Sequence, residues 1–322
     1  MSRIPKRRGG FREINAPDKF LRLVQARLHS RLLSRVELPE YTWAFEPGKS
    51  VPEMAKVHVG KQVIVSLDIR DFFPSITQRM IETMIIKEGL ADGPAARTIS
   101  ELCTYKWYLP QGGITSPKIS NLIVKNTFGD SVKKYCDKIG LEMTVYADDI
   151  TMSEKPGYYI ERIPSYGLSV VKDEFKTTAD YRCVTPINQA IEDIGALLRS
   201  YNFSLHHDKT KVMLNGTRKT VCGVVVNEKT NLAKKERLRL RAMVHNVCKN
   251  GVEAEAAKFG DGVSPSTFIS YLKGKLNWYR QLNSEKASSL ITKLNEYLES
   301  VSLVEEPTEG SEVTEEAQQV RV

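Results

Sequence analysis

The chain has 322 residues, 41% of them hydrophobic and 27% charged, which is enough for a sizeable core and about two or three packed lobes. No apolar run approaches the roughly 18 residues that a membrane-spanning helix needs, and no apolar segment follows the basic N-terminus, so we expect neither a membrane span nor a signal peptide. The five cysteines are scattered without a CxxC pair, which argues against a disulfide framework or a zinc site and favours reduced thiols in a cytoplasmic protein.

Charge is distributed unevenly along the chain. The net charge is +8, but residues 304–322 hold six glutamates and one arginine, and without them 46 basic residues face 33 acidic ones. Simple solubility is one explanation of a basic surface, but this excess favours a polyanionic partner such as nucleic acid. The acidic tail at 303–322 is weakly apolar and is predicted to be disordered.

The first predicted helix covers residues 19–33. Leu21, Val24, Leu28 and Leu32 recur at helical spacing, with arginines between them. This pattern predicts an amphipathic helix with an apolar stripe and a basic face.

A strand followed by a helix is predicted next. QVIVSLDI, at 62–69, places its valines and leucine on one face and ends near Asp68. After DFFPS, the pair Ser75 and Gln78 fits the capping box of a helix with a buried methionine and isoleucine stripe.

A glycine-containing loop and one long helix are predicted over 109–140. Ser116 is a suitable N-cap, Pro117 fits the first helical position, and Gly140 fits the C-terminal cap. EMTVYADDITMS then predicts a hairpin with its two aspartates at or beside the turn.

The remaining elements are predicted with less regular patterns. Residues 154–186 have no periodicity and are predicted to be an inserted loop or small hairpin. A helix is predicted at 187–202, followed by two short strands in FSLHHDKTKVM and TVCGVVVN. From Ala233 onward the chain is predicted to be helical and basic.

Three carboxylates lie at predicted strand ends. Asp68 ends one strand, and Asp148 and Asp149 lie at the tip of another strand pair, so all three could converge on one point. Hard cations such as Mg²⁺ prefer oxygen ligands and remove the repulsion between such groups. The alternative is that each aspartate forms a turn or caps a helix, as isolated aspartates usually do.

Taken together, these segments resemble the reverse transcriptase family. SLDIRDFFPSI resembles the family's first catalytic motif, LPQGGITSPKISN its nucleotide-pocket motif and VYADDITMS its second catalytic motif, in the family's order. The resemblance extends from about Arg8 to Asn283. It implies an α+β fold of right-hand polymerase architecture, with fingers, an antiparallel-sheet palm and a helical thumb.

The resemblance also implies a domain organisation. Residues 1–62 form the N-terminal and fingers region. Residues 63–229 form the palm, with part of the fingers at about 85–115 and the insertion at 154–186. A helical thumb covers 230–302, and the acidic tail covers 303–322.

Residue roles follow from the same resemblance. Asp68, Asp148 and Asp149 are implied to be catalytic and to hold two Mg²⁺ ions, with the Ile69 carbonyl as an extra ligand and Mn²⁺ as an alternative ion. Phe73 is implied to exclude a ribose 2′-hydroxyl and so to select dNTPs.

Further contacts to substrate are implied by position. Gln111 matches a residue that contacts the incoming nucleotide, and Arg12 one that contacts its triphosphate. Lys209 matches a residue that positions or protonates the leaving pyrophosphate, and Tyr146 one that lies under the primer end.

Within the family, the chain resembles bacterial retron enzymes. MAKVH keeps the alanine and the histidine, His58, of a retron element, with methionine for asparagine, and VCG resembles a Val-Thr-Gly triplet with Cys222 for threonine. By this resemblance His58 is expected among the RNA-binding residues. YLKGKLNWYRQLN resembles a thumb helix that reads structured RNA, and the side chains suited to phosphate and stacking contacts are Lys273, Lys275, Trp278 and Arg280. A basic face over a core tryptophan is the structural alternative.

The resemblance implies an RNA-directed DNA polymerase that copies a cognate structured RNA into branched RNA–DNA, multicopy single-stranded DNA, in antiphage defence with a separate effector protein. Another bacterial reverse transcriptase, of abortive-infection or group II intron type, is the alternative enzyme. A catalytically silent RNA-binding scaffold is the alternative from another class, although three intact aspartates argue against it. No membrane partner is expected, and the oligomeric state leaves no trace in the sequence.

Overall fold

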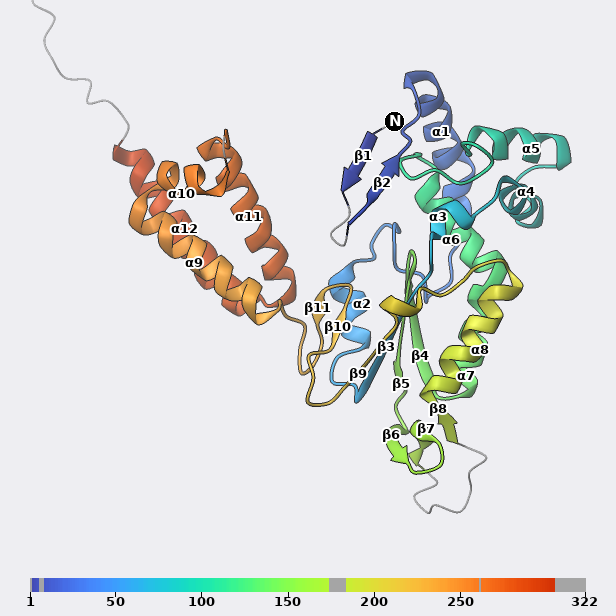
Figure 1. The fold of residues 1–322 in the computed structure, drawn as a ribbon. Coiled ribbons are helices and arrows are strands. Elements are labelled where there is room, and N and C mark those ends of the chain that lie inside the picture. Colours follow the sequence, from blue (N-terminus) through green and yellow to red (C-terminus); the bar gives the residue numbers. More distant parts are fainter. Residues whose placement is uncertain (1, 6–8, 174–183, 261, 305–322) are drawn as a thin grey trace, which may run out of the picture. The chain divides into compact units, whose positions relative to one another are not determined.

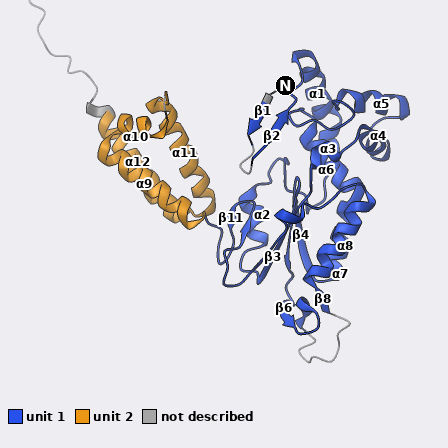
Figure 2. Ribbon diagram, viewed as in Figure 1, with its two compact units in different colours: residues 1–231 blue, residues 232–322 orange. Residues whose placement is uncertain are grey.

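The computed structural model describes residues 2–5, 9–173, 184–260 and 262–304. The chain divides into two compact units, residues 1–231 and residues 232–322, which Figure 2 distinguishes by colour. The first unit mixes helices with antiparallel strands, whereas the second contains helices in its described part (Figure 1). The acidic tail beyond Val304 lies outside the described residues, so its predicted disorder stays a prediction.

A four-stranded antiparallel sheet forms the centre of the first unit. Its strand order is β4-β5-β3-β9, from β4 (Leu141–Tyr146), β5 (Asp149–Glu154), β3 (Val63–Asp68) and β9 (Lys211–Leu214). The predicted strand at 62–69 is confirmed as β3, but Ile64 on its second face is buried as well. Both faces are buried because α7 (Asp130–Lys138) and α8 (Ile187–Ser200) lie along one side of the sheet and α2 (Val51–Val57) along the other (Figure 1).

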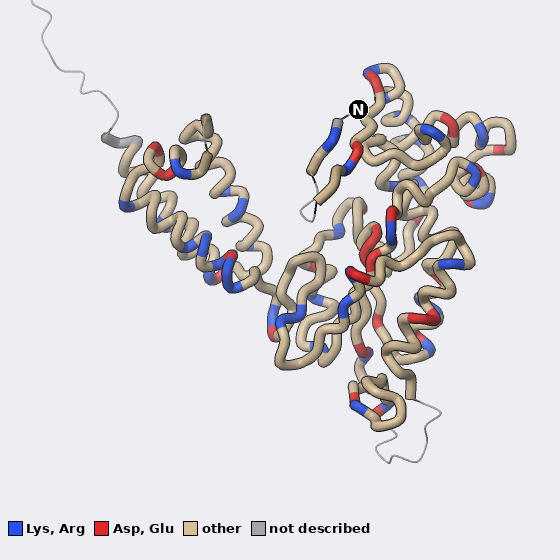
Figure 3. Tube along the Cα trace, in the orientation of Figure 1, with Lys and Arg blue, Asp and Glu red and all other residues tan. Residues whose placement is uncertain are grey.

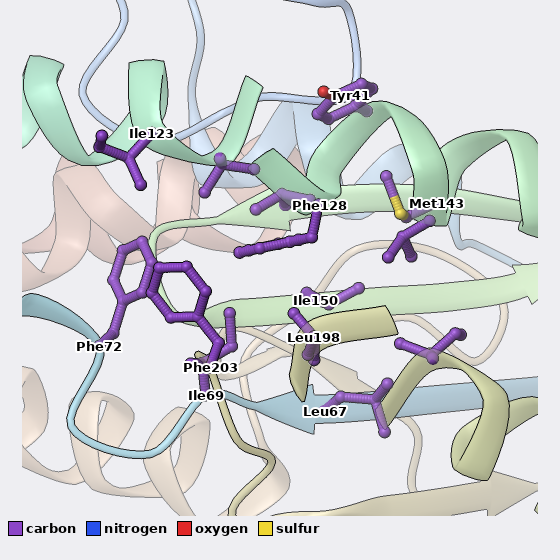
Figure 4. Packing of buried hydrophobic residues seen from close by; sticks show 14 of the residues in the cluster. Tyr41, Leu67, Ile69, Phe72, Ile123, Phe128, Met143, Ile150, Leu198 and Phe203 are labelled. Carbon is purple, nitrogen blue, oxygen red and sulfur yellow. The ribbon is translucent and has the colours of Figure 1, made fainter. Parts of the chain in front are cut away.

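The buried core joins the sheet to the helices through aromatic rings. Phe203 packs against Phe128 with ring centroids 5.2 Å apart and against Phe72 at 5.9 Å (Figure 4). Ile69 and Leu67 of the β3 region belong to the same cluster. This packing fixes the end of β3, which carries Asp68.

Three short helices follow β3: α3 (Phe72–Ser75), α4 (Gln78–Lys87) and α5 (Gly93–Leu102). The predicted Ser75 capping box is wrong, because Thr77 caps α4 by accepting a hydrogen bond from the Met80 N–H. The Ser75 hydroxyl instead donates to the Asp71 carbonyl at 3.0 Å. A four-residue helix therefore separates the strand end from α4.

The long helix predicted over 109–140 is interrupted. It comprises α6 (Ser116–Val124), a π-helical turn (Lys125–Gly129) and α7 (Asp130–Lys138), and Ser116 begins the helix rather than capping it. A Cβ on Gly129 would lie 2.5 Å from the Tyr41 hydroxyl oxygen, and that hydroxyl donates to Asp130 at 2.7 Å. The close approach of Tyr41 requires glycine there. Gly140, with φ 77°, follows the helix end as predicted.

The predicted insertion at 154–186 contains a small antiparallel sheet of order β6-β7-β8. Its strands are β6 (Tyr158–Ile163), β7 (Gly167–Lys172) and β8 (Val184–Pro186). Residues 174–183 lie outside the described part. The hairpin of β6 and β7 agrees with the small hairpin that the sequence predicted, while β8 adds a third strand.

The N-terminal region carries a hairpin and two helices. The hairpin, which the sequence did not predict, pairs β1 (Ser2–Pro5) with β2 (Phe11–Ile14). The predicted helix at 19–33 is α1 (Lys19–Arg31), followed by a 3-10 turn (Leu33–Arg35) and by α2 (Val51–Val57).

The predicted helix at 187–202 is α8 (Ile187–Ser200), with Ile187, Ile194 and Leu198 buried. The strand expected in FSLHHDKTKVM is β9, which follows a 3-10 turn (His207–Lys209). The strand expected in TVCGVVVN is a short hairpin of β10 (Thr220–Val221) with β11 (Val224–Val225). The first unit ends shortly after this hairpin.

The second unit contains four described helices: α9 (Lys234–Asn250), α10 (Val252–Phe259), α11 (Pro265–Leu282) and α12 (Ser284–Val304). Figure 3 marks basic residues along α9 and α11, as the sequence predicted. Across the described ranges, none of the helices is apolar and long enough to traverse a lipid bilayer.

Candidate active site

The two adjacent aspartates lie at the tip of the β4–β5 hairpin. Tyr146 pairs with Asp149, so Ala147 and Asp148 form a two-residue turn, which confirms the predicted hairpin. Ala147 has φ 55°, the positive value that a type II′ turn needs at its first central position. An alanine there costs about 1–2 kcal/mol. The turn therefore holds Asp148 in place at the expense of backbone strain.

Strand pairing brings Asp68 to this turn. Asp68 lies directly opposite Asp149 in the β3–β5 register, and the Ile69 N–H donates to the Asp148 carbonyl at 2.9 Å. Like charges at directly opposite positions destabilise a sheet. The fold thus brings together the three positions that the sequence placed at strand ends, although two of them are eighty residues away from the third.

The electrostatics of the site are unfavourable for three ionised carboxylates. Burial raises the pKa of Asp149 to about 6, with further contributions from the charges of Asp148 and Asp68. Burial, together with the charge of Asp68, also raises the pKa of Asp148. Nearby cations offset this in part: Lys209 and Arg12 act on Asp148, and Lys209 and Lys211 act on Asp149. The Lys209 ammonium lies 2.9 and 3.0 Å from the two Asp68 oxygens.

The donor set suits a hard cation, although the side chains are not grouped as a ligand sphere. Among the described residues there is no group of three or more His, Cys, Asp or Glu side chains at metal-binding spacing. Carboxylate and carbonyl oxygens are nevertheless the ligands that Mg²⁺ prefers, and the raised pKa values show a site short of positive charge. Divalent ions would supply that charge once Asp68 exchanges its contact with Lys209 for one with a metal.

The chain segment before β9 positions Lys209. The Arg70 N–H donates to the Ser204 carbonyl at 2.8 Å, and the His206 N–H donates to the Asp68 carbonyl at 2.7 Å. These bonds flank Ile69, whose own N–H donates toward Asp148. Because the N–H and C=O of one residue point to the same edge of an extended strand, the Ile69 carbonyl also lies on the Asp148 side.

A cavity of about 400 Å³ gathers residues that the sequence resemblance assigned to substrate contacts. The segments that line it come from the N-terminal hairpin, the end of β3, the loop before α6, the β4–β5 turn and the turn before β9. Its predicted members are Arg12, Ile69, Phe73, Gln111, Asp148 and Lys209. Residues far apart in the sequence therefore share one cavity next to the aspartates.

Packing fixes the ring of Phe73 at this cavity. Its ring lies edge-to-face on Phe72, with centroids 5.7 Å apart, and Phe72 is buried against Phe203. Asp71 precedes both rings with φ 44°, a left-handed conformation that turns the chain from β3 into α3. Phe73 is thus held by the core while it lines the cavity.

Glycine allows the Gln111 loop to approach the N-terminal hairpin. The Asn15 N–H donates to the Gln111 carbonyl at 2.8 Å. Gly112 has φ 111°, and a Cβ on it would lie 2.9 Å from the Ile14 Cγ2 atom. Buried Gln25 of α1 fixes the same loop, because its side-chain oxygen accepts from the Ile114 N–H at 2.9 Å. Arg12 and Gln111 are therefore brought to one cavity.

A second cavity, of about 1070 Å³, also borders the carboxylates. Asp68 and Asp149 line it, and Arg12 and Lys209 line both cavities. Arg12 and Lys209 are therefore available to a ligand in either cavity.

Cys222 is a site neighbour that sequence reasoning had read only as a family mark. Its thiol lies 4.0 Å from an Asp149 carboxylate oxygen, in the β10–β11 hairpin. Burial and the charges of Asp149 and Asp148 raise the pKa of Cys222 to about 12, so the thiol stays protonated. The contact depends on a hairpin far along the chain, which local sequence pattern does not reveal.

The expectation that His58 contacts RNA is wrong. His58 has 0% exposure, and its ring nitrogens lie 2.8 Å from the Ser153 and Thr144 hydroxyls. Burial lowers the pKa of His58 to about 3, so the ring is neutral. Its place in the sequence motif reflects packing of α2 on the central sheet.

The other expected nucleic-acid contacts occupy two places. Tyr146 is half-buried on the β4–β5 hairpin, with its ring centroid 6.2 Å from that of Phe45. Within α11, Lys273 and Arg280 are exposed, Trp278 is half-buried, and Lys275 lies 3.6 Å from Glu236. Their contacts with RNA stay predictions.

Sequence reasoning missed an aromatic turn at the cavity. Tyr105, Lys106 and Tyr108 line the 400 Å³ cavity beside Phe73 and Gln111. Three aromatic residues within four positions, directly before the Gln111 loop, are the sequence signal that could have identified it.

Comparison with known proteins identifies the family of the chain. Residues 4–240 match the family described as reverse transcriptase (RNA-dependent DNA polymerase), so the chain belongs to the reverse transcriptase family. The predicted α+β right-hand polymerase fold with an antiparallel palm sheet is thereby confirmed.

The chain is similar to retron reverse transcriptases. It is 28% identical to the retron Mx65 reverse transcriptase of Myxococcus xanthus over 89% of this chain and 62% of that relative. It is 23% identical to the retron Ec86 reverse transcriptase of Escherichia coli over 88% of this chain and 75% of that relative. The chain thus spans about six tenths of the Mx65 relative. The match to apo telomerase from Candida tropicalis covers 94% of this chain and 57% of that chain, with a TM-score of 0.47 and 10% identity.

Proposed function

We propose that this chain is an RNA-directed DNA polymerase of a retron, a nucleotidyltransferase that adds dNTPs to a primer on an RNA template. The observation that supports this most is the 400 Å³ cavity, where Arg12, Phe73 and Gln111 meet Asp148. An arginine can pair with the phosphates of a nucleotide, an aromatic ring can pack against its sugar, and carboxylates can bind the metal ions that accompany it. All of these groups border one space.

Asp68, Asp148 and Asp149 would hold two Mg²⁺ ions, with the Ile69 carbonyl as an extra ligand. Bound there, the ions would supply Lewis-acid chemistry, activating a primer hydroxyl and neutralising charge on the leaving pyrophosphate. The contribution of the chain is a fixed set of oxygen donors, because cross-strand pairing and the strained turn at Ala147 hold the backbone of all three aspartates.

The other residues of the cavity bind and orient the substrate. Arg12 holds the triphosphate, Gln111 contacts the nucleotide, and the ring of Phe73 excludes a 2′-hydroxyl. Lys209 leaves Asp68 to position or protonate the pyrophosphate, and Tyr146 supports the primer end. The position of Lys209 in both cavities is compatible with this exchange.

The retron assignment specifies the template, the product and the partners of the proposed polymerase. We infer that the template is a cognate structured non-coding RNA, and that synthesis is primed from the 2′-hydroxyl of a guanosine in that RNA. The product is branched RNA–DNA, multicopy single-stranded DNA. The helices of residues 230–302 grip RNA, and the complex acts in the cytoplasm in antiphage defence with a separate effector protein. The similarity to retron enzymes at 23–28% identity supports this part of the proposal.

Substitution of one carboxylate tests the polymerase assignment. Asp148→Asn is expected to lower extension of a primed RNA template with dNTPs and Mg²⁺ by at least about 10³-fold, because ion binding at such a site is worth several kcal/mol. Asp92→Asn is the matched control, since Asp92 caps α5 and asparagine caps equally well. Extension by Asp148→Asn at the wild-type rate would contradict the assignment.

Nucleic acid that accompanies the protein tests the retron assignment separately. The protein is purified from its native operon, and the bound nucleic acid is sequenced. A discrete branched RNA–DNA species is expected. Random or homopolymeric DNA would contradict the retron assignment and leave the polymerase assignment in place.

A further inference from the structure

The tight turn of residues 105–108, beside the cavity, has backbone φ angles that its two central residues rarely adopt. The Tyr105 N–H donates to the Tyr108 carbonyl at 2.9 Å, and the Tyr108 N–H donates back to the Tyr105 carbonyl at 3.2 Å. The two central residues, Lys106 and Trp107, have φ 50° and 72°. Type I′ turns with positive φ at both positions normally take asparagine and glycine. A lysine and a tryptophan there indicate strain that stability does not explain, which is a frequent mark of a functional site.

The surrounding backbone holds this turn rigidly. The Gln78 N–H, at the start of α4, donates to the Trp107 carbonyl at 2.9 Å. The Leu109 N–H donates to the Ile76 carbonyl at 2.9 Å. The Trp107 side chain is nevertheless 70% exposed, and Tyr105 and Tyr108 are 48% and 49% exposed. Three large aromatic side chains are thus presented to solvent on a fixed backbone.

The position of the turn indicates what it contacts. Tyr105, Lys106 and Tyr108 line the 400 Å³ cavity, whereas Trp107 is outside its lining. A mononucleotide within the cavity reaches the first three residues. A ligand that also reaches Trp107 must extend beyond the cavity, as a polynucleotide strand does.

The chemistry of the turn fits unpaired bases. Aromatic faces stack on bases of any sequence, and nearby basic side chains attract the backbone phosphates. The Lys106 ammonium lies 5.5 Å from the centroid of the Tyr105 ring, so a cation and an aromatic face are presented together. The template strand is the polynucleotide whose unpaired bases must lie next to the incoming nucleotide.

We propose that the turn of residues 105–108 is a stacking platform for the unpaired template strand just ahead of the nucleotide cavity, with Trp107 as its main contact. This inference rests on the proposed polymerase function. It assigns to the platform a role in template binding rather than in dNTP binding or in the chemical step.

Trp107→Gly separates function from folding. Glycine suits φ 72°, so the melting temperature is expected to stay the same or rise. Loss of one base stack is expected to weaken binding of a primer–template with a long single-stranded RNA overhang by roughly 5- to 150-fold. Binding of the same duplex with a single-nucleotide overhang should change little. Trp107→Phe is expected to restore most of the long-overhang affinity, and Phe20→Ala is the control, since Phe20 is 77% exposed on α1.

Fluorescence anisotropy measures both affinities, and steady-state extension measures the KM for dNTP. An unchanged long-overhang affinity in Trp107→Gly would overturn the proposal, as would equal losses on both substrates. A change confined to the KM for dNTP would place the turn at the incoming nucleotide instead, and a change confined to self-association would make it a protein contact. Failure of the wild-type protein to extend even the single-nucleotide overhang would count against the polymerase function itself.

Discussion

The two ends of strand β5 carry acidic side chains in opposite surroundings. At one end, Glu154 is 5% exposed and accepts hydrogen bonds from the Gln62 and Val63 N–H groups at 2.6 and 3.1 Å. At the other end, Asp149 lies opposite Asp68, and burial together with the charges of Asp148 and Asp68 raises its pKa to about 6.

This difference distinguishes structural from functional polar groups. Near the Glu154 end, His58 is also buried and bonded at both ring nitrogens. A buried polar group with its partners in place contributes to stability and to a single strand register. A half-buried carboxylate opposite another carboxylate destabilises the fold, an arrangement that is frequent at functional sites and that a bound cation would relieve. Glu154 is buried and Asp149 is half-buried, but the larger difference between the two ends lies in their partners.

Exchange of carboxylate for amide at the two ends gives the largest expected difference. Asp68→Asn should lower primer extension by at least about 10³-fold and leave the free energy of unfolding unchanged within about 1 kcal/mol, since the Lys209 partner is 40% exposed. Glu154→Gln should keep extension within about twofold and lower the free energy of unfolding by about 2–3 kcal/mol, because an amide NH₂ would face a backbone donor. Single-turnover extension and urea unfolding measure the two effects.

The critical outcome is which property each variant loses: primer extension in Asp68→Asn and stability in Glu154→Gln. A Glu154→Gln variant that unfolds like the wild type but fails to extend primers would remove the contrast between the two ends.

His58 gives the next largest effect, in the pH dependence of stability. Its folded pKa of about 3 is below the unfolded value of 6.5, so unfolding takes up a proton as the pH falls from 6.5 toward 3. The free energy of unfolding of the wild type should therefore drop by about 3 kcal/mol more than that of His58→Asn between pH 7 and pH 4. Urea denaturation at several pH values measures this difference. A constant difference across that range would show that His58 does not titrate as its burial implies.

Asp149 should make a smaller contribution than His58 to the pH dependence of the free energy of unfolding, and in the opposite direction. Its folded pKa of about 6 is above the unfolded value of 3.8, so ionisation destabilises the fold as the pH rises from 3.8 to 6. In chelator-treated protein, Asp149→Asn should gain about 2 kcal/mol of stability relative to the wild type between pH 4 and pH 8. Thermal and urea unfolding at the two pH values measure the gain. Added Mg²⁺ should stabilise the wild type and reduce the difference, and no gain at high pH would argue against a repulsive cluster.

Much of the local structure could be predicted from the sequence. The strand at β3, the hairpin around the two aspartates and α8 follow from periodicity, which depends on residues close in the chain. Other elements could not be predicted in this way. The π-helical turn at Lys125–Gly129 depends on Tyr41 approaching Gly129, and the true cap of α4 depends on where α3 ends.

The candidate site, like the fold, has features that the sequence predicts and features that need the tertiary structure. The sequence by itself determined which residues are proposed to carry the chemistry, namely Asp68, Asp148, Asp149, Phe73 and Gln111, because their motifs occur in the family's order. Only the tertiary structure decided their partners. It paired Asp68 with Lys209, buried His58 away from any ligand, and brought Cys222 to Asp149. The physical reason is that charge, burial and strain depend on neighbours from distant segments, which strand pairing and core packing select.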